Sequence, residues 1–418
     1  MSEALFLEAR TSRHRSANAL KSLGSMRVGE AIYLVALFVY FIQAFLDTTM
    51  MPYAMPGEVI PLLKGFAFAL VAVKLVLDGF SFSIKRALAV LLALSAGFSA
   101  MRIGGYAVPL QFLIMVAGAA DVDFDRIAKL YLWSSMVMTL ATVAASLAGV
   151  IENVSVPRAG GTVYAYGFYY STEFSAHALS ISIAWLYVHR ERLSAKVCLP
   201  VLLWSAMVFA LTDGRLSFFL TVLTVLAVAV VDKRAKKREA TYSYPKLLKL
   251  SYFFMATISI ALMIAYQGGG LLGALNKVLT NRLYYAHEGY LNYGITLFGQ
   301  QIQMTGWGGG RTVWAENYFY IDNSYVNILL RFGLVLLIAV LAVCSLPYAR
   351  LRNNCGVAAI LIAAVAMASF VNEHLMGLSY NFFALMAFAT STDFTSRQGT
   401  AECTPKPANV ELGAQDVD

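Results

Sequence analysis

Charged side chains are scarce in this chain. Asp, Glu, Lys and Arg make up only 13% of its 418 residues, whereas apolar types make up 59%. A soluble domain carries about 25% charged residues, so this shortage excludes an ordinary water-soluble fold. The apolar residues come in blocks of roughly 16 to 21, the length that an α-helix needs to cross a bilayer core. We therefore predict an all-α, polytopic integral membrane protein.

Motifs that hold metals, nucleotides or disulfide frameworks are also missing. The chain has four cysteines: Cys198, Cys344, Cys355 and Cys403. Their spacing matches neither a metal site nor a disulfide framework. There is no Walker-type phosphate loop, no zinc-binding pair and no Asp-x-Asp pair in an outer loop, because Asp121 and Asp123 fall on the predicted inner side. We therefore expect no cofactor and no bound metal.

The apolar blocks predict about twelve transmembrane helices. Their approximate positions are 31–46, 57–77, 87–101, 105–120, 130–150, 172–188, 197–212, 215–232, 250–267, 323–342, 354–371 and 377–393. The predicted order of segments is a cytoplasmic N-terminal tail at 1–30, nine helices in 31–267, a large extracytoplasmic loop at 268–322, three helices in 323–393, and a cytoplasmic tail at 394–418. The N-terminal tail is polar and basic and lacks the features of a signal peptide.

Basic residues set the predicted orientation. An even number of spans puts both termini on one side, and that side carries most of the Lys and Arg, so both termini are predicted to lie in the cytoplasm below the inner (plasma) membrane. The net charge of +8 then indicates contact with anionic lipids and not with nucleic acid. The few cations on the outer side oppose this rule and need another role. They are Arg102, Arg158, Arg215, Lys277, Arg282 and Arg311.

The loop at 268–322 is the one long interruption in the series of spans. It is rich in Gly and aromatic residues and poor in Ser, Pro and Lys, which favours a folded lid over disorder. Its aromatics either stack on sugar rings or, as is commoner for Tyr and Trp, anchor the loop at the interface. They are Tyr284, Tyr285, Tyr290, Tyr293 and Trp307.

Two outer turns carry groups suited to chemistry. Glu173 and His177 share a helix face by their i, i+4 spacing, which also fits a helix-packing contact. Arg215 follows Asp213 in a tight turn, where it could bind phosphate in a bidentate manner or simply pair with Asp213. Arg158 precedes the span that carries Glu173.

The large loop and the helix after it add further candidates. Arg282, His287 and Arg311 lie in the loop. Asp322 and Asn323 open the next span, where such residues usually cap a helix, but Arg331, two turns deeper, needs a partner or a function. Residues 372–374, Asn-Glu-His, have the composition of a plain polar turn.

Four segments resemble the Wzy-type polysaccharide polymerases and the related O-antigen ligases. They are 158–174, 213–217, 282 with 297–300, and 322–334. The second has Gly214 where the family's turn has Ser. Ligases usually have His-Asn where this chain has Asp322-Asn323, and this departure favours the polymerase.

The resemblance implies a metal-independent glycosyltransferase with a GT-C-like membrane fold. Such an enzyme polymerises oligosaccharide repeat units, carried on a polyprenyl (undecaprenyl) diphosphate, into capsule, exopolysaccharide or O-antigen on the extracytoplasmic face. Its partners would be the lipid-linked oligosaccharide, membrane lipids, and chain-length regulator or flippase proteins.

The residues fit this chemistry. Cations aimed at the leaving diphosphate stabilise the transition state, and Arg215 and Arg282, with Arg158, are predicted to do so. Asp322 is the first candidate for the general base that deprotonates the acceptor hydroxyl; Glu173, His177 and His287 are alternatives. The predicted substrate-binding set is Arg158, Arg215, Arg282, Arg311, Asn323 and Arg331.

Two other functions stay open. An O-antigen-ligase-like enzyme would transfer finished polymer to a different acceptor. A transporter or flippase of lipid-linked sugar would need cations through the midplanes of its spans, whereas most of the outer cations here lie at the rim.

Overall fold

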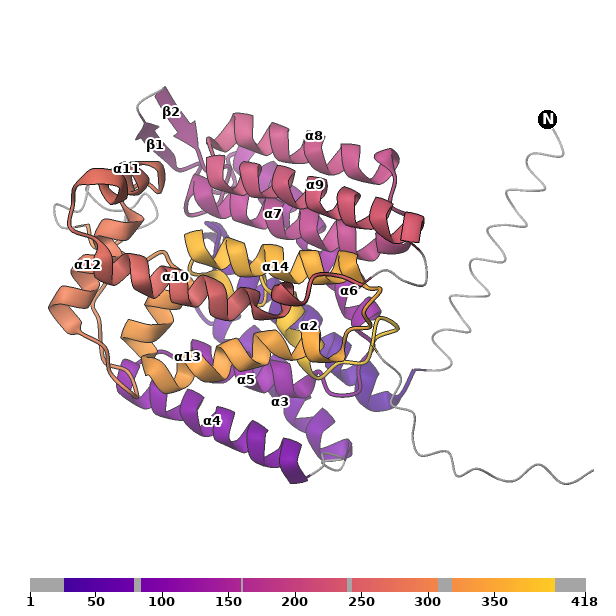
Figure 1. The fold of residues 1–418 in the computed structure, drawn as a ribbon. Helices are drawn as coiled ribbons and strands as arrows, with labels where there is room; N and C mark the ends of the chain where they lie inside the picture. Colours follow the sequence, from indigo (N-terminus) through magenta and orange to yellow (C-terminus); the bar gives the residue numbers. More distant parts are fainter. Residues whose placement is uncertain (1–25, 79–83, 159–160, 239–242, 307–317, 395–418) are drawn as a thin grey trace, which may run out of the picture.

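The helices of this protein pack side by side in one bundle (Figure 1). The computed structural model describes residues 26–78, 84–158, 161–238, 243–306 and 318–394. Its α-helices are α2 Val28–Leu46, α3 Val59–Leu77, α4 Ile84–Gly104, α5 Val108–Gly118, α6 Phe124–Leu147, α7 Ser171–Val188, α8 Ala195–Thr212, α9 Arg215–Arg238, α10 Ser251–Ala265, α11 Gly270–Val278, α12 Arg282–Tyr293, α13 Ser324–Arg350 and α14 Gly356–Val371. An antiparallel hairpin joins β1 Ser155–Arg158 to β2 Gly161–Tyr164.

Seven helices in the described part of the chain are long and apolar enough to cross a membrane. They are α2, α3, α6, α8, α9, α13 and the run Lys246–Ala265, which contains α10. Many of their large apolar side chains point outward, such as Leu62, Val76 and Leu203. That surface is unfavourable in water and favourable in lipid, so the chain is a polytopic α-helical membrane protein. The helices identified as spans are fewer than the twelve predicted.

The two ends of the bundle differ. The hairpin, α11 and α12 gather at one end, opposite the loop that joins α13 to α14 (Figure 1). This end corresponds to the predicted extracytoplasmic side and is called the outer end below; the other is the inner end. Helix α7 runs between them and is buried along most of its length. Because neighbouring helices α6, α8, α9 and α14 cover it, α7 can carry Ser and His side chains away from lipid.

The prediction of a transmembrane helix at 377–393 is wrong. This segment is buried but is not an α-helix; its only helical part is a short 3-10 turn, η7 Phe382–Ala387. Irregular backbone at membrane depth needs internal partners. Here Tyr131 donates to the carbonyl of Ser379 at 2.6 Å, and Arg350 donates to the carbonyls of Met386 and Ala387. Hydropathy alone cannot distinguish such a buried crossing from a helix.

Helix α13 is kinked at Gly333, which has φ +89° and ψ 166°. The loop segment 296–300 docks on the kink: the amide of Gln300 donates to the carbonyl of Arg331 at 2.9 Å, and the amide of Leu334 donates to that of Thr296 at 3.0 Å. A Cβ at Gly333 would lie 2.5 Å from the amide nitrogen of Gly299, so only glycine allows this approach. Two segments that the family resemblance singled out, 297–300 and 322–334, therefore meet.

Candidate functional site

Glu173 lies in the first turn of α7, at the outer end. Its Oε2 accepts a hydrogen bond from the hydroxyl of Tyr380 and lies 3.5 Å from Nε2 of His374. Both partners belong to the segment that follows α14. The site is therefore assembled from parts of the chain that are about 200 residues apart in sequence.

Tyr380 is held between two imidazole rings. The ring of His374 stacks on it with centroids 3.8 Å apart, and that of His177 with centroids 4.3 Å apart. His177 Nε2 lies 2.9 Å from Oγ1 of Thr48, whose hydroxyl proton already goes to the carbonyl of Phe45. His177 therefore donates through Nε2, which leaves Nδ1 as a buried acceptor without a partner among the described residues.

Glu373 follows α14 and is bound by two donors. Its Oε1 accepts from the Tyr320 hydroxyl and its Oε2 accepts from Nδ2 of Asn327 at 3.1 Å. Burial raises the pKa of Glu373 to about 7. His374 and the Tyr320 hydrogen bond oppose this rise. A carboxyl with this pKa can either hold or accept a proton near neutral pH.

The turn that carries Glu373 is tied to the start of α13. Ser324 donates from Oγ to the carbonyl of Asn372, and the same oxygen accepts from the amide of Leu375 at 3.1 Å. A single side chain thus holds both sides of the turn. This contact explains why residues distant in sequence, Glu373 and Asp322, come together.

Asp322 forms an ion pair with Arg282. The distance between Oδ2 and Nε is 3.4 Å, and the Asp322 side chain is 29% exposed. Arg282 opens α12, and its Nη1 also donates to Oγ1 of Thr280 at 2.5 Å. Burial raises the pKa of Asp322, while Arg282 and His374 lower it. The carboxylate can therefore accept a proton yet remains open on one side.

These groups act on one another and form one site, called here the outer cluster: Glu173, Arg282, Asp322, Glu373 and His374. Asp322 and Glu173 both raise the pKa of Glu373, and burial lowers the pKa of His374. The cluster thus contains three carboxyl groups, one arginine, which pairs with Asp322, and a histidine whose pKa burial lowers. Under-compensated charge of this kind is typical of functional sites.

Arg215 lies at the start of α9, in the outer turn that follows α8. Its guanidinium makes a bidentate contact with Asp213, at 2.9 and 3.1 Å, and its side chain is 70% exposed. A Cβ on Gly214 would lie 2.4 Å from that of Ser175, so the turn packs closely against α7 beside Glu173. The neighbouring residue, Leu216, belongs to an apolar group with Leu283 and Val371, next to Arg282 and the 372–374 turn.

The predicted polar face of α13 has two different roles. Asn323 caps the helix by accepting from the amides of residues 325 and 326, and it donates to Ser259 and to the carbonyl of Phe370. These bonds use both the oxygen and the nitrogen of the Asn323 side-chain amide. That Asn323 binds substrate stays a prediction. Arg331 stacks over the Tyr106 ring at 4.0 Å and donates to Asn327 Oδ1 at 3.4 Å, so it reaches the outer cluster through Asn327.

Three further predicted residues, like Arg215, are not joined to the outer cluster by any contact in the described part of the chain. His287 Nδ1 lies 2.7 Å from the carbonyl of Met263, on the side of α12 that faces α10. Arg158 pairs with Gly161 in the hairpin, but its side chain lies outside the described residues. Arg311 lies in the segment 307–317, which is also outside them.

Sequence reasoning missed part of the site. Tyr320 and Tyr380 were not candidates, and 372–374 was interpreted as a plain polar turn. A Glu-His pair at the outer end of a span was a signal that could have been weighted more. Tyr380 offers no signal, because it lies within an apolar stretch.

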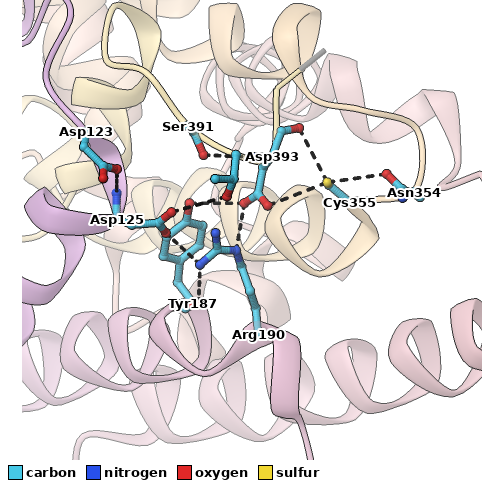
Figure 2. Close-up of polar contacts among 9 residues, drawn as sticks. Asp123, Asp125, Tyr187, Arg190, Asn354, Cys355, Ser391 and Asp393 are labelled. Atoms are coloured by element: carbon cyan, nitrogen blue, oxygen red, sulfur yellow. Dashed lines mark hydrogen bonds and ion pairs between the residues drawn. The ribbon is translucent and has the colours of Figure 1, made fainter. Parts of the chain in front are cut away.

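A second charged cluster lies at the inner end of α7 (Figure 2). Arg190 pairs through Nη1 with Asp125 and through Nε with Asp393, both at 2.8 Å, and lies over the Tyr187 ring at 4.1 Å. The Tyr187 hydroxyl donates to Asp393 at 3.1 Å, and the Cys355 thiol contacts the same carboxylate at 3.8 Å. We call this group the inner clasp, because it ties the start of α6, the end of α7 and the segment after η7 together.

A substrate has to approach the outer cluster from its exposed side. The cavity beside His374 and Tyr380 has a volume of about 20 Å³, which is space for a single water. Asp322 and Arg215 are the parts of the site that face outward. Among the residues that the structure describes, no group of three or more His, Cys, Asp or Glu is placed to hold a metal ion.

Comparisons with known proteins add no relative: no family model, no curated protein and no solved structure matches this chain.

Proposed function

We propose that this chain is a membrane glycosyltransferase that joins lipid-linked oligosaccharide repeat units on the extracytoplasmic side. One observation carries the proposal. Candidate bases and cations from α7, the start of α12, the start of α13 and the end of α14 converge at the same end of the bundle. The resemblance to Wzy-type polymerases in 158–174, 213–217, 297–300 and 322–334 supports the choice of substrate.

The donor is a glycan on a polyprenyl diphosphate, which leaves with the electron pair of the broken anomeric C–O bond. Negative charge then grows on the diphosphate oxygen. A guanidinium can bind two phosphate oxygens at once, and a fixed one stabilises the transition state more than the ground state. We assign this role to Arg282 in the outer cluster and to Arg215 in the outer turn that packs against α7.

The acceptor is a sugar hydroxyl of a second repeat unit. Its oxygen forms the new bond to the anomeric carbon, and its proton passes to a carboxylate. Asp322 is the first choice for this base. Its side chain is 29% exposed, whereas that of Glu173, the other outer carboxylate in an ion pair, is 17% exposed. Glu373, with a pKa of about 7, is placed to share the proton once Asp322 has accepted it.

The Asp322–Arg282 pair also bears on the alternatives. A carboxylate with a raised pKa beside a partly exposed arginine fits a base near a diphosphate. A flippase would use cations along its path, whereas Arg331, the deeper arginine of α13, is stacked on Tyr106 and 9% exposed. A ligase would differ in its acceptor, and ligases usually have His at the position of Asp322.

The test is the size of the glycan made by cells that carry Asp322→Asn or Arg215→Ala. We expect the long polymer to be lost and single repeat units to accumulate on the outer side, since removal of a general base or a fixed cation lowers the rate about 10²- to 10⁴-fold. Arg102→Ala is the control, because Arg102 is an exposed outer cation in the last turn of α4 and is not part of the outer cluster. It should leave polymer length unchanged.

The glycan that accumulates also distinguishes the polymerase from a ligase or a flippase, provided that membrane insertion of each variant is confirmed. Long chains that remain on the lipid would indicate a ligase. Short units held on the cytoplasmic side would indicate a flippase. Normal long polymer in both variants would reject the proposal.

A further inference from the structure

Helix α11, Gly270–Val278, exposes part of its apolar surface at the outer end. Leu271 is 85% exposed and Val278 is 68% exposed. They are seven residues apart and share one strip along the helix. The neighbouring strip, with Leu272 and Leu275, packs on the bundle. The apolar arc of α11 is therefore wider than its contact with the protein.

The packed strip sets the depth of α11 in the membrane. Leu272 and Leu275 share an apolar group with Leu262, which lies one turn inside the membrane-spanning run Lys246–Ala265. The same group contains Leu216, at the outer start of α9. Helix α11 thus lies at the level where the spans emerge from the hydrocarbon core, beyond the ends of α8 and α9 (Figure 1).

An exposed apolar residue of the preceding span lies close to α11 in the chain. Ile264, near the end of α10, is 49% exposed, and only residues 266–269 separate α10 from α11. Lys277 is exposed beside Val278. A helix with one apolar arc and a lysine at its polar edge is the pattern of helices that lie in the membrane interface, where the lysine reaches lipid phosphate.

We infer that α11 is an interfacial helix whose Leu271 and Val278 insert into the outer leaflet of the bilayer. The occupant of its exposed strip is phospholipid. Because only residues 279–281 link α11 to Arg282, the membrane surface fixes the height of this arginine and hence of the outer cluster. This inference does not depend on the reaction proposed above.

The experiment measures depth in proteoliposomes. In a chain whose four native cysteines are replaced by alanine, Val278→Cys carries a polarity-sensitive fluorophore. The bilayers contain phospholipids with a nitroxide near the headgroup. We expect these lipids to quench the label at residue 278 about threefold more than a label at Glu152→Cys, an exposed residue of an outer loop, and aqueous iodide to show the reverse order.

Two results would overturn the inference. Iodide quenching at residue 278 that equals that at residue 152 would place the strip in water. A blue-shifted emission without quenching by either reagent would mean that protein covers it. Should labelled Val278→Cys fold poorly, Leu271→Cys tests the same strip, and its outcomes are interpreted in the same way.

Discussion

Charged clusters lie at both ends of α7, and their carboxylates are paired in different ways. In the inner clasp, one arginine meets two aspartates at 2.8 Å, and Arg190 and Asp393 are about 10% exposed. In the outer cluster, Arg282 pairs with only one of three carboxyl groups, Asp322, and tyrosine hydroxyls take the place of cations at Glu173 and Glu373. The comparison teaches that the carboxylates of the inner group are paired with a cation, whereas burial raises the pKa of the outer carboxyl groups Asp322 and Glu373.

One segment joins the two clusters. At the start of residues 374–394, His374 contacts Glu173 at the outer end of α7. The segment then crosses the bundle beside α7, and Asp393 near its end pairs with Arg190. Its backbone bonds are mostly short turn bonds, such as those from Tyr380 to Gly377 and from Ala389 to Leu385, which shape the turns but do not fix the segment against the bundle. Its position therefore depends on contacts with other helices, and the inner clasp is one of them.

The largest effect should come from breaking the inner clasp. Arg190→Ala leaves the largely buried Asp393 and the partly buried Asp125 without their cation. Breaking a buried ion pair on one side costs about 3–5 kcal/mol, so we expect a large drop in the thermal unfolding temperature of the purified protein. The control is Arg192→Ala, two residues away and exposed, which should change the unfolding temperature little. Equal stability of the two variants would show that the clasp does not hold the fold.

A smaller effect, with a distinct pH dependence, is expected from Glu373→Gln. Burial raises the pKa of Glu373 from 4.5 to about 7, so the folded chain keeps a proton that the unfolded chain releases. The resulting stability is present below about pH 4.5 and is lost as the pH rises to about 7. Glutamine cannot lose a proton, so the unfolding temperature of the variant should fall less than that of the wild type between about pH 5 and about pH 8.

The matched control for Glu373→Gln is Glu152→Gln, at an exposed position. It should keep the wild-type dependence on pH. If the unfolding temperatures of Glu373→Gln and the wild type change equally with pH, the Glu373 carboxyl is already ionised at pH 5. The negative charges of the outer cluster are then balanced more fully than we infer.

The smallest effect should come from Tyr320→Phe. The Tyr320 hydroxyl donates to Glu373 and lowers its pKa, so its removal should raise that pKa further. We expect the pH range over which the unfolding temperature declines to move upward by less than about one unit. The same measurement on Tyr164→Phe, an exposed tyrosine of β2, should show no movement. A shift to lower pH would mean that the hydroxyl does not stabilise the ionised carboxylate.

Some of the candidate site could be predicted from the sequence. Glu173 and His177 lie on one buried stretch of α7, and Asp322 with Asn323 opens α13, as their spacing indicated. Such patterns are local, because side chains four residues apart on a helix are neighbours whatever surrounds them. Arg215 was identified in the same way, from a tight turn between two apolar blocks.

Other parts could not be predicted from local patterns. Tyr380 reaches Glu173 across 207 residues, and Tyr187 reaches Asp393 across 206. The stretch 377–393 is as apolar as a membrane helix, yet it is not one, since it is covered by protein and its carbonyls are satisfied by Tyr131 and Arg350. Neither hydropathy nor helical periodicity contains that information.

Composition by itself determined that this chain is a helical membrane protein. Charged residues are scarce and the apolar blocks are long enough to enter lipid, where the backbone can form hydrogen bonds only with itself, as in a helix. The tertiary structure alone decided which polar groups meet. It placed His374 against Glu173, Tyr320 against Glu373 and Arg190 between two aspartates, because contacts between distant segments depend on how whole helices pack and not on their neighbours in sequence.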